Sequence, residues 1–347
     1  MPVPHHRSGA ARLPRTAVAG TAVLAAAAAL LCGPAALGAA AVPSPAAAAA
    51  VPTATADDGA TVTAEHWLDA RTVDLTVQSP AVGGAVPVRM ILPTNWAAQP
   101  NRTWPVLYLL QGAHDDYTSW TRETGIEAFS ADKDMITVMP SAGPTGIPTH
   151  WSNNGQPGGA DYETFQVTEL MQLLQRDYRA GTARAAAGVS TGGYGALAMA
   201  ARHPGAFKAV ASYSGIVDTT FPGIPTIVLA IVTREGLNGL TLWGDPYVLN
   251  PTLWKNNNPA LQAAGLRGTA LYMSQGSGLV GGGGDPLGEG LESTLWPQAQ
   301  SFSVRLLFMG IPVTTHFYTG GVHNWSSWQG EFTRSWPMLA HGLGLPS

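Results

Sequence analysis

The chain has 347 residues and a formal net charge of −4, with 18 Lys and Arg against 22 Asp and Glu. It shows no basic patch of the kind that binds nucleic acid, so we expect no nucleic-acid partner. A single cysteine excludes a disulfide framework within the chain.

Residues 1–50 have the composition of an export signal. They contain Arg7, Arg12 and Arg15, no acidic residue, and an Ala- and Leu-rich stretch from residue 17 onward. A basic start, an apolar middle and small residues at the cleavage point are typical of a secretory signal. Prolines interrupt the apolar stretch, which argues against a membrane anchor. We therefore predict a signal peptide over residues 1–50, cleaved between residues 40 and 56, and a linker over residues 51–65.

The single cysteine, Cys32, lies inside this predicted signal. Leu31 precedes it where a lipoprotein signal needs a small residue, so we expect no lipidation. Loss of the three arginines moves the net charge from −4 to −7. Export without disulfides favours a secreted, extracytoplasmic bacterial protein. The high Ala, Gly and Pro usage indicates a high-GC genome, as in actinobacteria.

Residues 66–347 are predicted to form one α/β domain, in which the pattern of apolar residues changes along the chain. Alternating patterns predict half-buried strands over residues 71–78, at a sheet edge, and 86–92. Continuous apolar runs predict strands covered on both faces over residues 105–110 and 135–139. Further strands are predicted over residues 183–189, 207–214, 269–274 and 313–319, and helices over residues 162–178, 192–201 and about 292–309.

Two segments fall outside this alternation of strands and helices. Residues 218–258 are rich in Pro, Gly, Trp and Asn, and we predict an irregular segment that caps the site. Residues 276–290 are predicted to form a glycine-rich loop, with residues 281–284 as a flap. The rest predicts a mostly parallel central sheet with helices on both faces.

Residues 183–204 contain the motif on which the functional prediction depends. A run of small apolar residues ends in Gly188-Val189-Ser190-Thr191-Gly192 and passes directly into an Ala-rich helical pattern. A G-x-S-x-G motif between a strand and a helix is typical of the nucleophile of an α/β hydrolase. The alternative is a glycine-rich turn that holds a serine by chance. The flanking patterns favour an α/β-hydrolase fold with Ser190 as the nucleophile.

A serine nucleophile needs a base, and histidine has the pKa suited to that work. In α/β hydrolases the histidine follows the last strand. His323 lies in the loop after the last predicted strand, whereas His316 lies within that strand, His203 follows the predicted helix over residues 192–201 and His341 lies near residue 347. We therefore predict His323 as the base.

The acid that orients His323 is expected after the penultimate strand. Asp285, Glu289 and Glu292 all lie there, and position along the chain does not decide among them.

The oxyanion hole needs two N–H donors. We expect them from Thr191, which follows the nucleophile, and from Ala113 in the loop after residues 105–110. Gln111 and His114 flank Ala113, so we expect their side chains to contact the substrate.

The order of short motifs resembles the secreted esterase D-type α/β hydrolases, and most closely the antigen 85 mycolyltransferases. The resemblance covers about residues 70–340. The matching motifs are Tyr108-Leu109-Leu110-x-Gly112, Asp115-Asp116-Tyr117-x-x-Trp120, Glu163-Thr164-Phe165 with Glu169-Leu170, Gly188-x-Ser190-x-x-Gly193, His203-Pro204-x-x-Phe207, Ser214-Gly215 and His323-x-Trp325-x-x-Trp328.

The resemblance also implies which carboxylate is the acid. The family has its acid in a Leu-Glu-Gly stretch past a glycine-rich loop, and Leu291-Glu292-Ser293 aligns with it, with Phe302 in register. That implies Glu292 as the acid and Asp285 as the alternative.

The loop after residues 105–110 departs from the family pattern. The antigen 85 enzymes have Asp-Gly-Leu-Arg where this chain has residues 111–114 (QGAH), and their Asp and Arg help to hold the sugar acceptor. Their paired cysteines are absent from residues 140–160. Ester chemistry is therefore expected to carry over better than recognition of trehalose.

These observations predict a serine esterase or acyltransferase that forms an acyl-serine and passes the acyl group to water or to a sugar or alcohol hydroxyl. The substrate is expected to be an acyl ester or glycolipid, and the resemblance is compatible with association with the cell envelope. The alternatives are a trehalose mycolyltransferase or diacylglycerol acyltransferase.

A more distant alternative is a non-catalytic, carbohydrate-binding protein of the cell wall. In that case Trp120, Trp151, Trp325 and Trp328 would offer a stacking surface for sugars. In the enzyme, Trp325 is expected to contact the substrate. We expect no cofactor and no metal, because the histidines lack the spacings of zinc hydrolases and the glycine run lacks the Lys-Ser/Thr of a phosphate loop.

Overall fold

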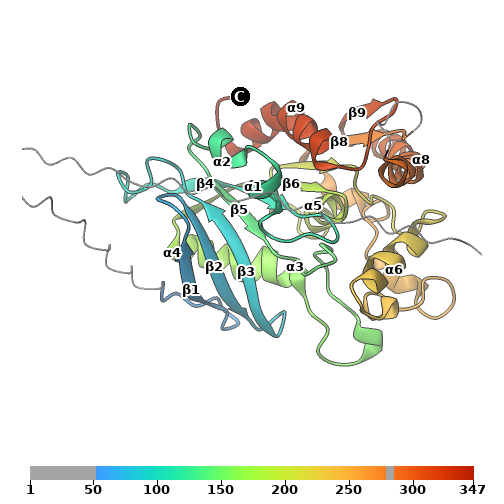
Figure 1. Ribbon diagram of the computed structural model, residues 1–347, viewed down its shortest axis with the longest axis horizontal. Helices are drawn as coiled ribbons and strands as arrows, with labels where there is room; N and C mark the ends of the chain where they lie inside the picture. The colour runs from blue at the N-terminus through green and yellow to red at the C-terminus, as the bar shows by residue number, and fades with distance from the viewer. Residues whose placement is uncertain (1–51, 279–284) are drawn as a thin grey trace, which may run out of the picture. The chain divides into compact units, whose positions relative to one another are not determined.

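The computed structural model describes residues 52–278 and 285–347 (Figure 1). The predicted signal peptide with Cys32, and residues 281–284 of the predicted flap, lie outside these ranges. Among the described residues, every helix is too short or too polar to cross a membrane.

One sheet of nine strands forms the centre of the described part of the chain, in the order β1-β2-β3-β5-β4-β6-β7-β8-β9. The pairs from β1 to β5 are antiparallel, and the five pairs from β5 to β9 are parallel. The strands are β1 (Thr61–Trp67), β2 (Thr72–Ser79), β3 (Gly84–Ile91), β4 (Trp104–Leu110), β5 (Ile136–Pro140), β6 (Ala180–Val189), β7 (Ala209–Tyr213), β8 (Ala270–Gly276) and β9 (Thr314–Tyr318).

Helices cover both faces of this sheet, because its parallel strands are apolar on both sides (Figure 1). One buried cluster joins the sheet to α4 (Leu170–Asp177), α5 (Thr191–Arg202) and α8 (Pro286–Phe308). A second cluster joins the other face to α1 (Ser119–Glu123), α2 (Ile126–Phe129) and α9 (Trp325–Leu343). The predicted mostly parallel sheet with helices on both faces is thus confirmed.

A third buried cluster joins the segment between β7 and β8 to α5 and α8. The elements of this segment are α6 (Ile224–Arg234), η3 (Gly239–Thr241), α7 (Pro251–Asn256) and η4 (Ala263–Leu266). Residues 218–258 were predicted to be irregular, and that prediction is wrong for α6, η3 and α7. Gly223 and Pro225 begin α6, and Pro is favoured in the first turn because its missing N–H needs no partner there.

Three other boundaries differ from the predictions. β1 begins at Thr61, inside the predicted linker over residues 51–65, and takes the edge position expected for residues 71–78. The helix predicted over residues 162–178 is α3 (Tyr162–Thr164), a π-helical turn η2 (Phe165–Glu169) and α4. α8 begins at Pro286, six residues before the predicted start, because Asp285 caps its first turn. A short turn, η1 (Asn153–Gly155), completes the elements.

Candidate active site

Ser190 stands at the junction between β6 and α5, with a backbone conformation that most residues avoid. Its φ is 54° and its ψ is −119°, and it is the N-cap residue of α5. A side chain at Gly188 would place its Cβ 2.2 Å from the Gly192 carbonyl oxygen, which explains why the turn needs glycine. The Ser190 N–H donates to the Tyr213 carbonyl at 2.9 Å, which ties the turn to β7.

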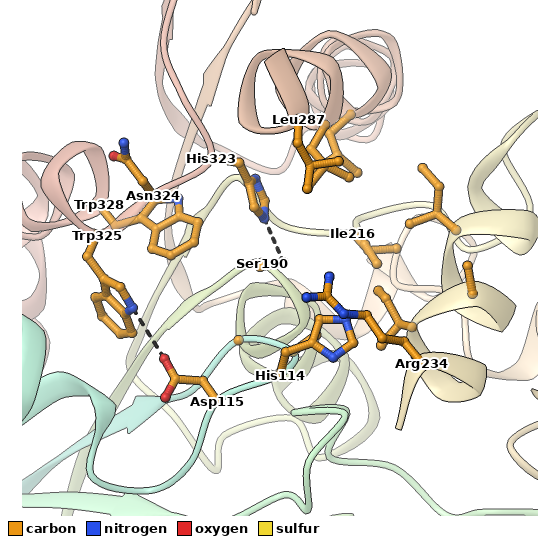
Figure 2. A pocket seen from close by; sticks show the side chains of 17 residues that line it. His114, Asp115, Ser190, Ile216, Arg234, Leu287, His323, Asn324, Trp325 and Trp328 are labelled. Atoms are coloured by element: carbon orange, nitrogen blue, oxygen red, sulfur yellow. Dashed lines mark hydrogen bonds between the residues drawn. The ribbon is translucent and has the colours of Figure 1, made fainter. Parts of the chain in front are cut away.

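His323 and Ser190 are brought together although 133 residues separate them. The Nε2 atom of His323 lies 2.9 Å from the Ser190 Oγ atom (Figure 2). The imidazole packs edge-to-face against Trp328, with ring centroids 4.9 Å apart. It comes from the loop between β9 and α9, where Asn324 caps α9. The ring therefore points at the hydroxyl from a fixed position.

Glu292 lies on the other side of the imidazole. Its Oε1 is 2.8 Å from His323 Nδ1. Its Oε2 accepts hydrogen bonds from the Gly276 N–H at 2.8 Å and from Gln275 Nε2 at 2.6 Å. The residue is completely buried, so these donors supply the hydrogen bonds that water would otherwise provide.

Asp285 and Glu289 do not share this arrangement. Asp285 is exposed, and its carboxylate accepts a hydrogen bond from the Gly288 N–H at 3.0 Å as the N-cap of α8. Neither carboxylate forms a hydrogen bond with His323 in the described part of the chain. The structure therefore contradicts Asp285 as the partner of His323.

The loop after β4 passes beside Ser190, and its residues face in different directions. Gly112, Ala113 and His114 line the cavity above Ser190. Gln111 is buried, and its Nε2 donates to the carbonyls of Asp115 at 2.6 Å and Gly143 at 3.0 Å. Gln111 holds the loop in place and does not line the cavity, so the expectation that it contacts the substrate is corrected.

The two N–H groups expected for the oxyanion hole flank this site. Ala113 lines the cavity, and Thr191 is the first residue of α5. Within residues 52–278 and 285–347, neither N–H donates to a protein acceptor. Both donors are therefore unused by the fold.

A cavity of about 470 Å³ opens over Ser190, within the size range of small-molecule sites. Its apolar walls come from α6, which lies within the segment predicted to cap the site, and from the start of α8 (Figure 2). The side chains of these walls are Ile227, Ala230, Ile231, Leu287, Leu291 and Leu295. The helical spacing of residues 224–234 was the signal available in the sequence.

The charged residues around the cavity are mostly paired. His114 Nδ1 contacts the Glu235 carboxylate, which joins the loop after β4 to the end of α6. Asp115 pairs with Arg122 at 2.5 Å. The Asp115 carboxylate also accepts a hydrogen bond from Trp325 Nε1 at 3.3 Å, and Trp325 lines the cavity as expected of a substrate contact.

Of the four tryptophans that a carbohydrate-binding surface would use, Trp120 and Trp328 are buried, and Trp151 and Trp325 are only partly exposed. Trp120 and Trp328 are buried and donate to the Leu110 carbonyl and the Ser214 hydroxyl. They pack with Trp325 in edge-to-face contacts beneath the cavity. These rings support the site from within the core.

His316 and His203 contact carboxylates away from Ser190. His316 Nδ1 lies 2.9 Å from Glu331, and His203 Nε2 lies 2.8 Å from Glu163.

Comparison with known proteins identifies relatives over most of the chain. Residues 79–339 match the model of the esterase family, described as "putative esterase". The chain is 30% identical over 289 residues to the diacylglycerol acyltransferase/mycolyltransferase Ag85A of Mycobacterium leprae. This alignment covers 78% of this chain and 83% of that protein. It is 28% identical over 256 residues to the diacylglycerol acyltransferase/mycolyltransferase Ag85B of Mycobacterium intracellulare, and this alignment covers 70% of this chain and 77% of that protein.

The fold is shared with a solved structure as well. The crystal structure of Mycobacterium tuberculosis MPT51 aligns over 79% of this chain and 100% of that chain, with a TM-score of 0.65 and 22% identity. The predicted resemblance to the antigen 85 proteins and the predicted α/β-hydrolase fold are confirmed. The chain belongs to the esterase family.

Proposed function

We propose that the protein is a serine esterase or acyltransferase in which Ser190, His323 and Glu292 form the catalytic triad. The observation that carries the proposal is the unbroken line of hydrogen bonds from Ser190 Oγ through His323 to Glu292, 2.9 Å and 2.8 Å long, beneath the cavity. Membership of the esterase family supports the same reaction class.

The first half of the proposed reaction forms an acyl-enzyme. Ser190 Oγ attacks the ester carbonyl carbon while His323 Nε2 takes the hydroxyl proton. Glu292 accepts the Nδ1–H hydrogen bond and stabilises the imidazolium. The tetrahedral intermediate collapses when the C–O bond to the leaving alcohol breaks, and His323 returns the proton to that oxygen. The acyl group is then bound to Ser190.

The second half releases the acyl group. Water, or the hydroxyl of a second alcohol, attacks the acyl-Ser190 carbonyl while His323 takes its proton. When the bond to Ser190 breaks, the proton returns to Oγ. The Ala113 and Thr191 N–H groups would hold the oxyanion in both halves, because Thr191 follows Ser190, Ala113 lines the same cavity, and neither N–H has an acceptor among the described residues.

The proposed substrate is a carboxylic ester with an apolar portion, since six aliphatic side chains of α6 and α8 line the cavity. Hydrolysis is favoured over transfer to trehalose, because residues 111–114 lack the Asp and Arg expected of the sugar-binding loop. The Ag85A and Ag85B relatives are named as mycolyltransferases and diacylglycerol acyltransferases, and those two activities are the transfer alternatives.

Secretion is part of the proposal and rests on the composition of residues 1–50. The test is expression of the full chain in an actinobacterial host, followed by N-terminal sequencing of the protein from the medium. A mature N-terminus between residues 40 and 56 is expected. Protein retained inside the cell with residue 1 intact would contradict secretion.

The catalytic proposal is tested with 4-nitrophenyl esters of increasing acyl length and with a fluorophosphonate probe. The wild-type protein is expected to cleave the esters and to carry the probe on Ser190, as located by peptide mass spectrometry. Ser190→Ala is expected to lose both. Ser293→Ala is the matched control, because Ser293 follows Glu292 but its hydroxyl donates only to the Gly290 carbonyl. Equal activity of wild type and Ser190→Ala would contradict the proposal.

A further inference from the structure

Arg234 is the last residue of α6 and lines the cavity over Ser190. On α6 it continues the stripe formed by Ile227, Ala230 and Ile231, which are spaced so that all four residues share one helix face. The stripe therefore changes from aliphatic to cationic at its C-terminal end. In Figure 2 the guanidinium extends from α6 toward Ser190, on the same side as His114.

The position of this end of α6 is determined by the next residue. Glu235 forms an ion pair with His114, which follows Ala113 in the loop expected to supply an oxyanion donor. This contact places the end of α6 beside the loop after β4, and the Arg234 side chain lines the cavity from an exposed position.

Arg234 differs from the other charged residues of the cavity because no carboxylate pairs with it. The other charged or titratable lining groups are His114, paired with Glu235, Asp115, paired with Arg122, and His323, paired with Glu292. Arg234 has no ion pair and no side-chain hydrogen bond among the described residues. Residues 1–51 and 279–284 contain no Asp or Glu, so the rest of the chain has no carboxylate side chain to offer it.

We infer that the natural substrate is an ester that carries an anionic group, a carboxylate or a phosphate, and that Arg234 binds this group. The inference rests on the proposed function and specifies its substrate class. A guanidinium presents several N–H donors in a fixed plane that matches the oxygens of such anions. The aliphatic walls of α6 and α8 would hold the apolar portion of the same molecule.

The anion can belong to the acyl group or to the leaving alcohol, and two sets of matched esters distinguish them. The first set consists of the 4-nitrophenyl monoesters of adipic, suberic and sebacic acid, each compared with the mixed methyl 4-nitrophenyl diester of the same acid. The second compares 4-butyryloxybenzoate with its methyl ester. Within each pair the charge is the main difference, so the ratio of the two kcat/KM values measures recognition of the anion.

The wild-type protein is expected to prefer the charged ester of at least one pair, and Arg234→Gln is expected to lower that preference about tenfold. Arg234→Lys should retain part of it, because the charge remains. The wild-type preference should also fall between 0.05 and about 1 M NaCl, since salt screens a partly exposed charge pair.

Arg305→Gln is the matched control. Arg305 is likewise a basic residue in the last turn of its helix, α8, and is exposed, but it does not line this cavity. Its substitution removes one positive charge and should leave the ratio at the wild-type value.

Two results would overturn the inference, and they are distinguishable. In the first result, the wild type cleaves the esters, but the ratio of kcat/KM for charged and uncharged esters is the same in Arg234→Gln as in Arg305→Gln for both sets. Arg234 then does not bind an anion, and the proposed function stands. If Ser190→Ala cleaves the esters as well as the wild type, the proposed function fails and the inference fails with it.

Discussion

The Glu292 carboxylate contacts His323 with one oxygen and the backbone of β8 with the other. Oε1 lies 2.8 Å from His323 Nδ1, and Oε2 accepts the Gly276 N–H at 2.8 Å. A buried carboxylate held by several donors keeps a fixed orientation. The imidazole is consequently held with Nε2 directed at Ser190.

Replacing this carboxylate is the first test of the arrangement. Glu292→Gln keeps the shape of the side chain but removes the charge that stabilises the imidazolium. We expect kcat for a 4-nitrophenyl ester to fall by about 10³- to 10⁴-fold. Asp285→Asn is the control, because asparagine also caps a helix N-terminus, and its activity should stay within about twofold of wild type. Comparable losses in the two variants would show that Glu292 has no special role.

Gly276 offers a test that leaves the triad side chains unchanged. A Cβ at this position would lie 2.7 Å from the Gly320 carbonyl oxygen and 3.0 Å from Glu292 Oε2. Gly276→Ala should displace the carboxylate and lower kcat at least tenfold, with a lower melting temperature.

Gly290→Ala is the matched control for that substitution. A Cβ at Gly290 meets no atom within 4 Å, and the residue lies inside α8. Alanine there should stabilise the helix by about 0.5–1 kcal/mol and preserve activity. Equal activities of the two alanine variants, measured on one short-chain ester, would contradict the explanation.

The aliphatic cavity predicts a limit on acyl length. Ala230 is the smallest side chain of the α6 wall, and Ala230→Leu would add bulk inside the cavity. We expect kcat/KM for octanoyl and longer esters to fall about tenfold while acetyl esters stay within about twofold. Thr233→Leu makes a similar change on the exposed side of α6 and should leave the chain-length profile unaltered. A uniform loss across all esters would argue against an acyl-binding role.

Glu163 predicts a pH-dependent contribution to stability. Burial raises the pKa of Glu163, but the hydrogen bonds from His203 and Arg202 outweigh burial, so the pKa lies below its ordinary value of about 4.3. A lowered carboxylate pKa stabilises the folded state above the unfolded-state pKa, and the stabilisation is lost as the pH falls through the folded-state pKa.

Glu163→Gln should therefore lower the free energy of unfolding by about 3 kcal/mol near pH 7. The difference from wild type should shrink as the pH falls from about 5 to about 3, as measured by urea unfolding at each pH. Glu127→Gln, at an exposed position in α2, should show no such trend. A difference that stays constant over this pH range would contradict the ionic explanation.

Local constraints explain why some of the site was predictable from the sequence. The turn at Ser190 requires glycine within two residues on each side, and the strand and helix beside it have regular apolar patterns. His323 could be identified by its place after the last strand. These features depend on residues close together in the chain.

Distance in the chain explains why other parts were not predictable. Asp285 and Glu292 lie seven residues apart on one segment, and only the packing of α8 against β8 decides that Glu292 contacts His323. Gln111 and Ala113 are two residues apart in one loop, yet only Ala113 lines the cavity. The direction of a side chain in a loop depends on distant partners, such as the Gly143 carbonyl that accepts from Gln111.

The sequence by itself determined the strands from β2 to β9, the turn at Ser190 and the identity of its histidine, because backbone sterics and apolar periodicity act over a few residues. Only the tertiary structure decided that part of the segment predicted to cap the site folds into α6, and that Arg234, which has no ion pair among the described residues, lines the cavity over Ser190. Glu235 meets His114 across 121 residues of chain, and no local pattern encodes a contact over that separation.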